Sequence, residues 1–366
     1  MKHLSEYRDE ALTRQLLEQI HAVVTRPWTL MEVCGGQTHS LVKNGILKML
    51  PEQITMVHGP GCPVCVTPIH IIDEAIALSQ KPQVILCSFG DMLRVPGTKI
   101  SLLEAKAGGA DVRMVYSPLE AVKLAKENPD KEVVFFAVGF ETTAPANALS
   151  VIQAAKQGVS NYSILASHVL VPPAMEAILA DPETKVNAFL AAGHVCTIMG
   201  FNEYDPIAEK YKVPIVVTGF EPIDLLQGIY MAVKQLESGE AKVENQYIRY
   251  VQREGNLRAK EAIDEVFAVS DREWRGIGTI PHSGWEVNDD YARYDARKKF
   301  SLIAVASEDI TTCIAGEIMK GKKKPFDCPH FGKGCTPEKP MGSPMVSSEG
   351  ACAAYYHFSQ AELLPA

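Results

Sequence analysis

The sequence predicts an α/β protein with two Rossmann-like parallel-sheet domains and a loop-rich C-terminal domain. Between about residues 28 and 220, short apolar runs are repeatedly followed by a small or polar residue and then by a helical stretch, which is the pattern of a βα unit. The runs are apolar throughout and do not alternate, as in strands that helices cover on both faces. After about residue 240, apolar runs become scarce and Gly, Pro and Lys become frequent. Such a region needs something besides hydrophobic burial to order it.

The expected strands divide into two successive sheets, and an amphipathic helix precedes them. The predicted strands are residues 30–33, 54–57, 84–87, 112–115, 133–138, 163–166, 188–191 and 215–218. The predicted domains are 25–117, 118–235 and 236–366, and the helix at 1–24 could pack on the last of them or on another domain. The apolar residues of that helix at helical spacing are Leu12, Leu16, Leu17 and Ile20.

The bulk composition is that of a soluble globular protein. The 366 residues carry a net charge of −8, with 46% hydrophobic and 22% charged residues, so there is no electrostatic case for a nucleic-acid partner. The longest apolar runs are far below the roughly 18 residues of a membrane span. The first residues are charged and polar and do not resemble a signal peptide. We therefore expect a cytoplasmic protein.

Four of the nine cysteines follow one another in the C-terminal region. A reducing compartment disfavours structural disulfides, so clustered thiols point to metal binding or redox chemistry. Four thiolates suit either a [4Fe–4S] cluster or a tetrahedral zinc ion. Zinc sites usually contain paired C-x₂₋₄-C units, and wide, uneven spacing favours the iron–sulfur cluster, although unrelated buried thiols remain an alternative. The four are Cys313, Cys328, Cys335 and Cys352.

A C-x-x-C motif directly follows the second predicted strand, in the segment HGPGCPVC at 58–65. A thiolate at a helix N-terminus is stabilised by the helix dipole, which lowers its pKa and raises its reactivity. Pro63 suits the first helical turn. The sequence therefore predicts a redox dithiol of Cys62 and Cys65, with metal ligation or structural thiols as alternatives.

A further cysteine, Cys34, follows the first predicted strand in the segment EVCGGQTH at 32–39. The paired glycines allow the backbone to come close to whatever Cys34 holds. His39 could ligate a metal, tune the thiolate or donate a proton, although a lone histidine here is more often a hydrogen-bonded one.

Ligands collect at the carboxyl ends of the strands in open α/β sheets. We therefore expect one cleft between the two sheets to gather the functional side chains. For Glu141 the candidate roles are orienting a partner, stabilising a cation or capping a helix. The candidates are Cys34, Cys62, Cys65, Glu141, His168, His194 and Glu221.

These motifs together resemble the hydrogenase maturation factor HypD family along nearly the whole chain. The segments that carry the resemblance are CGGQTH at 34–39, GPGCPVC at 59–65, GFETT at 139–143, GFEP at 219–222 and VSSEGAC at 346–352. The resemblance implies a monomeric scaffold that pairs with the small chaperone HypC. It also implies that cyanide arrives from HypE, with HypF upstream, and that the Fe(CN)₂CO unit of [NiFe]-hydrogenases is built on the scaffold.

The resemblance also implies a role for each cysteine motif. Cys34 resembles the family's iron-holding thiol, which works with a cysteine of HypC. Cys62 and Cys65 resemble its redox dithiol, and the four C-terminal cysteines resemble its [4Fe–4S] ligands. Soft thiolate donors suit iron with cyanide and carbonyl ligands, and a cluster beside a dithiol can supply electrons. The family implies an assembly factor with redox activity more than a turnover enzyme.

Two other functions remain in competition. A stand-alone thiol–disulfide oxidoreductase would need only the C-x-x-C motif, which leaves the four C-terminal cysteines and the chain length without a purpose. An iron–sulfur hydratase or lyase normally holds its cluster with three protein thiols, and here four are present.

Overall fold

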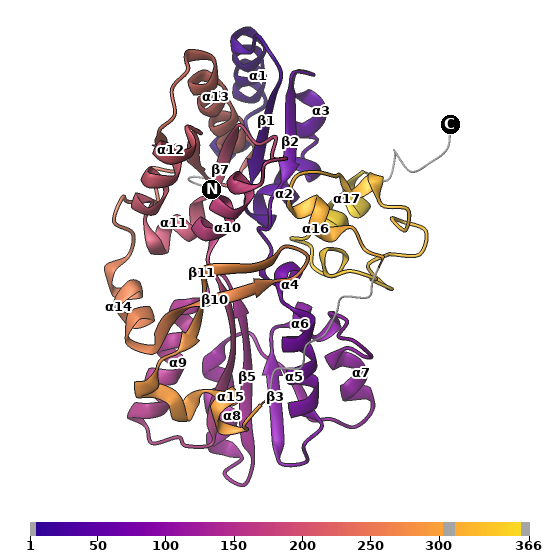
Figure 1. Cartoon of the computed structure of the whole chain (residues 1–366), viewed down its shortest axis with the longest axis vertical. Helices are drawn as coiled ribbons and strands as arrows, with labels where there is room; N and C mark the ends of the chain where they lie inside the picture. Colours follow the sequence, from indigo (N-terminus) through magenta and orange to yellow (C-terminus); the bar gives the residue numbers. More distant parts are fainter. Residues whose placement is uncertain (1–4, 303–311, 360–366) are drawn as a thin grey trace.

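Two β-sheets, placed one after the other along the long axis of the molecule, form the frame of the protein (Figure 1). The computed structural model describes residues 5–302 and 312–359. We call residues 312–359 the cysteine-rich tail, and Figure 1 shows it in yellow at one side of the molecule, beside the junction of the two sheets. Within the described residues, no helix is both long enough and apolar enough to cross a bilayer.

The first sheet contains five parallel strands in the order β2-β1-β7-β8-β9. Alternate side chains of each strand enter different cores. Leu30 and Val216 pack under α1 (Glu10–Val23) and α13 (Pro222–Ser238). The opposite face packs against α10 (Val171–Ala180), α11 (Gly193–Met199) and α12 (Asp205–Tyr211). The strands are β1 (Trp28–Glu32), β2 (Ile54–His58), β7 (Ala188–Ala192), β8 (Ile215–Thr218) and β9 (Val243–Asn245).

The second sheet contains six strands in the order β10-β11-β6-β5-β3-β4. Strands β6, β5, β3 and β4 are parallel, and the antiparallel hairpin β10-β11 is added at the β6 edge. The strands are β3 (Val84–Ser88), β4 (Val112–Met114), β5 (Glu132–Gly139), β6 (Tyr162–Val169), β10 (Phe267–Trp274) and β11 (Gly278–Val287). The helices that cover one face are α8 (Pro118–Glu127), α9 (Ala144–Lys156) and α14 (Leu257–Val266), and those on the other are α5 (Ile69–Ser79), α6 (Gly90–Arg94) and α7 (Leu102–Ala107).

All eight predicted strands are present within three residues at each end, but they pair differently from the prediction. The sequence analysis assigned one sheet to 25–117 and another to 118–235. In the structure β1 and β2 pair with β7, β8 and β9, whereas β3 and β4 pair with β5 and β6. The chain therefore passes from the first sheet to the second after β2, returns after β6 and leaves again after β9. Tertiary contacts determine which strands pair. A local apolar run predicts that a strand is present but does not predict its partner.

Residues beyond 236 also contribute to both sheets, which corrects the boundary predicted there. Strand β9 closes the edge of the first sheet, and the β10-β11 hairpin extends the second. The hairpin has no continuous apolar run in the sequence because its strands are only partly buried. In β10, Phe267 and Trp274 are buried while most residues between them are not. A strand with one exposed face shows no continuous apolar run.

The N-terminal helix, whose packing partner the sequence left open, packs on the first sheet. Helix α1 lies against α13, and Ile20 is completely buried in the core that also contains Leu225 and Ile229. Leu12 is 46% exposed, so the apolar face of the helix is buried mainly in its second half. The helix therefore seals one face of the first sheet.

The cysteine-rich tail folds around a small core of its own. It contains two short helices, α16 (Ala315–Met319) and α17 (Ala351–Phe358). Its buried residues Phe331, Met345 and Tyr355 pack together with Val42 of α2 (Gly35–Lys43). The tail is thus seated on the helix that follows β1, and this contact brings it to the carboxyl end of the first sheet.

Candidate functional site

Cys34 lies where β1 ends and α2 begins. Its backbone is extended and it is the N-cap residue of α2, and the residue is only 4% exposed. Glycines allow neighbouring backbone segments to pass close to Cys34. A Cβ atom on Gly61 would lie 2.3 Å from the Cys34 nitrogen, and one on Gly35 would lie 2.2 Å from the Glu349 carbonyl oxygen. The chain segments that carry these residues approach one another too closely for any side chain larger than hydrogen.

The Cys34 thiol faces a histidine from the helix that follows the neighbouring strand of the same sheet. Its Sγ lies 3.7 Å from Nδ1 of His194, the second residue of α11, which follows β7. Burial lowers the pKa of His194 to about 4, so the ring is neutral at neutral pH. Burial also raises the pKa of Cys34, with a further contribution from the Glu349 carboxylate. A thiol and a neutral imidazole thus lie side by side, and a metal ion binding here would displace the thiol proton.

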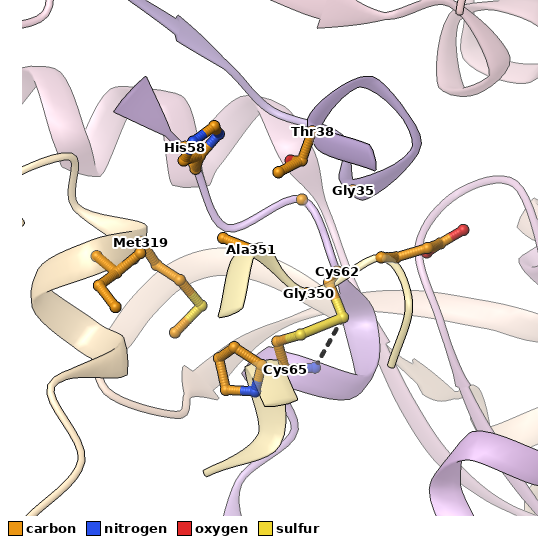
Figure 2. Close-up of a pocket in the computed structure, with 13 residues that line it drawn as sticks. Gly35, Thr38, His58, Cys62, Cys65, Met319, Gly350 and Ala351 are labelled. Carbon is orange, nitrogen blue, oxygen red and sulfur yellow. Dashed lines mark hydrogen bonds between the residues drawn. A yellow bond between two sulfur atoms is a disulfide. The ribbon is translucent and has the colours of Figure 1, made fainter. Parts of the chain in front are cut away.

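The C-x-x-C pair follows β2 and lies beside the Cys34 loop. Cys62 is the N-cap of the short helix α4 (Pro63–Val66), and its sulfur accepts a hydrogen bond from the Cys65 backbone N–H at 3.3 Å. The two sulfur atoms are joined in a disulfide, with Cα atoms 5.2 Å apart (Figure 2). Both residues are buried. Pro63 occupies the first helical turn as the sequence predicts.

One pocket joins the Cys34 loop, the disulfide and the cysteine-rich tail (Figure 2). Gly35 and Thr38 come from α2, and Cys62 and Cys65 lie opposite them. Met319, Gly350 and Ala351 bring the tail to the same pocket (Figure 2). The Ser343 hydroxyl donates to the Cys65 carbonyl oxygen at 2.7 Å, so the tail is bonded directly to the C-x-x-C backbone.

The four cysteines of the tail lie near one another. Cys335 and Cys352 are buried, and Cys313 and Cys328 are partly buried. Burial raises the pKa of Cys352 well above its ordinary value, and the three other thiols raise it further. The Met341 backbone N–H donates to the Cys335 sulfur at 3.3 Å.

The donor set of the tail fits a four-thiolate metal centre in chemistry and in neighbourhood. Across residues 5–302 and 312–359, however, no three His, Cys, Asp or Glu side chains are already close enough together to hold a metal ion. The thiols would have to move closer to bind one.

Glu141 is buried on the second sheet, at the end of β5. It is 1% exposed, and its carboxylate accepts a hydrogen bond at 2.8 Å from the N–H of Val171, the first residue of α10. Its second oxygen has no hydrogen-bond partner in the described residues. Burial raises the pKa of Glu141 to about 8, so this carboxyl group is largely protonated at neutral pH. Of the roles considered from the sequence, helix capping matches these contacts.

His39 points to the tail. Its Nδ1 lies 3.3 Å from the Ser348 carbonyl oxygen, and its ring meets the edge of Phe358 at 5.0 Å. The histidine beside the Cys34 sulfur is His194. The recorded contacts of His39 therefore seat the tail on α2.

The chain is similar to known proteins over nearly its whole length. Residues 11–359 match the family model described as HypD, hydrogenase formation hypA family. The chain belongs to the HypD family. It is 48% identical to the hydrogenase maturation factor HypD of Rhodobacter capsulatus, with 99% of each chain covered. It is 47% identical to the HypD of Escherichia coli K12, again over 99% of each chain. It is also 48% identical to the hydrogenase expression/formation protein HupD of Azotobacter chroococcum, over 98% of this chain and 97% of the relative.

This HypD-family chain gathers some of the predicted cleft residues and separates others. Cys34, Cys62, Cys65 and His194 lie together on the first sheet. His168 is instead completely buried in the second sheet, where its Nε2 lies 2.6 Å from the Asn147 amide nitrogen, and burial lowers its pKa to about 3. Glu221 caps α13 and forms an ion pair with Arg8. Sheet membership explains the position of His168, which belongs to β6 of the second sheet, whereas Glu221 follows β8 of the first sheet.

The sequence analysis missed a buried polar set behind Cys34. Glu32, His58 and Tyr355 are connected by hydrogen bonds, although they are far apart in the chain. The available signal was an acid and a histidine at the ends of two strands that precede the cysteine motifs. No sequence pattern pointed to Tyr355 as the third member.

Proposed function

We propose that this chain is a scaffold on which the iron of [NiFe]-hydrogenase receives its cyanide and carbonyl ligands, and that Cys34 holds this iron. The observation that carries the proposal is the Cys34 thiol, which is buried at the end of β1 beside His194. The next residue, Gly35, lines the same pocket as the disulfide. The names of the full-length relatives support hydrogenase maturation as the process served.

The surroundings of Cys34 suit a transient iron ligand. Because its pKa is raised, the empty site keeps the thiol protonated and unreactive, and iron binding must release that proton. Thiolate is a soft donor that suits iron carrying cyanide and carbonyl groups. In the proposal a second thiolate comes from a cysteine of the small chaperone HypC, so iron is held between two chains.

The disulfide between Cys62 and Cys65 is assigned a redox role. Its reduction breaks the S–S bond, takes up two electrons and two protons, and yields two thiols. The pair lines the same pocket as Gly35, the residue after Cys34. Electrons stored there would lie next to the iron-binding loop.

The four tail cysteines are assigned to a [4Fe–4S] cluster, for which their number and neighbourhood are the support. When bound, such a cluster supplies one-electron redox chemistry. The contribution of this chain is the placement of the tail, which Ser343 bonds to the Cys65 backbone. Cyanide is proposed to come from HypE, with HypF upstream.

Infrared spectroscopy on the anaerobically purified protein with its small partner chain tests the role of Cys34. We expect cyanide and carbonyl stretching bands that disappear in Cys34→Ser. Cys196→Ser serves as the matched control, since Cys196 is also buried in the same core and its substitution should leave the bands unchanged. Bands of full intensity in Cys34→Ser would refute the assignment.

A thiol–disulfide oxidoreductase is the second candidate, and the Cys62–Cys65 disulfide at a helix N-terminus favours it. The two functions make different demands on Cys34. If Cys34→Ala matures hydrogenase as well as the wild type while Cys62→Ala abolishes maturation, the dithiol function stands without the scaffold.

A further inference from the structure

A chain of buried hydrogen bonds connects the cysteine-rich tail with the Cys34 peptide. The Tyr355 hydroxyl lies 2.9 Å from Nε2 of His58, and Nδ1 of His58 lies 2.7 Å from Oε1 of Glu32. The other carboxylate oxygen of Glu32 accepts the backbone N–H of Cys34 at 2.9 Å. Thr38 of α2 donates its hydroxyl to Oε1 of Glu32. Both oxygens of the carboxylate are therefore occupied, and one of them holds the peptide of the candidate iron ligand.

All three members of this chain are buried side chains. Glu32 is 0% exposed, His58 2% and Tyr355 5%. A buried carboxylate is costly to remove from water, and apolar residues of similar volume are often at least as stabilising as a buried ion pair. A fully bonded buried network instead favours one arrangement of the groups that it connects. Here the network fixes the position of the Cys34 backbone, because the Cys34 N–H donates to Glu32.

The three members come from elements that only the tertiary fold brings together. Glu32 ends β1, His58 ends the adjacent β2, and Tyr355 belongs to α17 of the tail. Tyr355 follows Cys352 by three residues, so the two lie on neighbouring turns of one side of α17. Figure 2 shows His58 beside the pocket to which Gly350 and Ala351, at the start of α17, also belong. A shift of α17 would therefore change the hydrogen bond between Tyr355 and His58.

We propose that Tyr355, His58 and Glu32 are positioning residues that couple the seating of α17 to the orientation of Cys34. When α17 is in place, the chain of bonds holds the Cys34 peptide so that its thiol faces His194. When α17 shifts, the Glu32 carboxylate is released and the Cys34 loop loosens. The inference rests on the proposed function for its purpose, but the position of the Cys34 thiol can be measured without iron.

Tyr355→Phe is the sharpest variant, because it removes only the hydroxyl. The ring keeps its edge contact with Phe326 at 5.3 Å. Tyr356→Phe is the matched control, since it removes a hydroxyl from the next residue of the same helix. The Tyr356 hydroxyl has no recorded hydrogen bond to any described residue, whereas the Tyr355 hydroxyl bonds to His58.

The experiment measures the rate of iodoacetamide alkylation at each cysteine of the anaerobic, metal-free full-length protein by peptide mass spectrometry. We expect Tyr355→Phe to raise the rate at Cys34 by roughly 3- to 10-fold, as loss of one buried hydrogen bond implies. Tyr356→Phe should leave it unchanged. Cys87 and Cys196, both 0% exposed, report general loosening. An unchanged Cys34 rate in Tyr355→Phe, or an equal rise at Cys87 and Cys196, would overturn the proposal.

A double-mutant cycle distinguishes one connected chain from independent effects. If Tyr355 acts through His58, then adding Tyr355→Phe to His58→Leu should not raise the Cys34 rate further. Rates that multiply would contradict the coupling. If His58→Leu also raises the alkylation rate at Cys87, this variant loosens the whole protein. The comparison of Tyr355→Phe with Tyr356→Phe then decides whether Tyr355 positions Cys34.

Failure of the proposed function has a separate signature. The infrared bands would then survive in Cys34→Ser, while the alkylation result would still report whether Tyr355 positions Cys34.

Discussion

At the scale of single residues, burial decides the chemistry of the site more than residue type does. Cys34 is at the N-terminus of a helix, a place that normally favours a thiolate, but its burial raises its pKa. His194 is neutral for the same reason. Glu141 shows the effect most clearly, since burial leaves it protonated at neutral pH.

The raised pKa of Glu141 makes the stability of the protein depend on pH. The folded protein keeps this proton up to about pH 8, whereas the unfolded chain releases it near the ordinary glutamate pKa of 4.5. Between these values the folded state binds more protons, so its stability falls as pH rises. Glu141→Gln removes this group. We therefore expect Glu141→Gln to gain stability relative to the wild type between pH 5 and pH 8, measured as the urea midpoint at each pH.

Glu52→Gln is the control for that experiment, because Glu52 is exposed. Its urea midpoint should equal that of the wild type at both pH values. An equal difference between Glu141→Gln and the wild type at both pH values would contradict the buried, protonated carboxyl group.

At the scale of elements, the site is built from loops that follow parallel strands and from the glycines that let those loops meet. The loop after β2 crosses the Cys34 backbone at Gly61. The backbone N–H of Gly35 donates to the Gly61 carbonyl oxygen at 3.0 Å. Glycine is required here because two backbone segments approach each other closely. The atoms that an added Cβ would meet belong to the backbone, which cannot move aside as the end of a flexible side chain could.

Gly61→Ala should therefore destabilise the protein and disturb Cys34. The added Cβ atom would lie 2.3 Å from the Cys34 nitrogen and 2.5 Å from the Val33 carbonyl carbon. Overpacking of this kind costs about 1–3 kcal/mol or more. Urea unfolding measures the loss. Gly334→Ala is the matched control, because no atom lies within 4 Å of its added Cβ. Equal stability of the two variants would show that the loops separate easily.

At the scale of the whole molecule, the two sheets are interleaved in sequence. Each sheet combines strands from distant parts of the chain, and the chain passes between the sheets after β2, β6 and β9. One core includes Phe140 from the second sheet together with Ala192 and Val195 from the first. The tail is tied to the side of the first sheet by Lys322, which forms ion pairs with Asp181 and Glu183. Neither sheet is complete within one contiguous stretch.

A fragment of residues 25–117 should consequently fail to fold. It contains β1 to β4, but β1 has lost β7 and β3 has lost β5, so the central pairings of both sheets are missing. Far-UV circular dichroism and urea titration of the isolated fragment test this expectation, with the full chain as the reference. A cooperative unfolding transition of the fragment would mean that its four strands form a sheet on their own.

The sequence by itself determined the class of the fold and the position of its cysteine motifs. Continuous apolar runs marked eight of the strands because helices cover both faces of the two sheets. Cys34 and Cys62 were expected at strand ends for the same local reason, and both lie there. The family followed from five motifs spread over the chain.

Only the tertiary structure decided which strands pair, which histidine meets Cys34 and what lies behind it. Pairing depends on contacts between residues more than a hundred positions apart, as for Leu30 and Ala188. The neighbour of Cys34 is His194 because β7 lies beside β1. Tyr355 contacts His58 from the cysteine-rich tail, and no periodic pattern in the sequence predicts that the tail lies beside β2. Local patterns report burial and chain direction, whereas the partners of a buried polar group are set by the packing of distant segments.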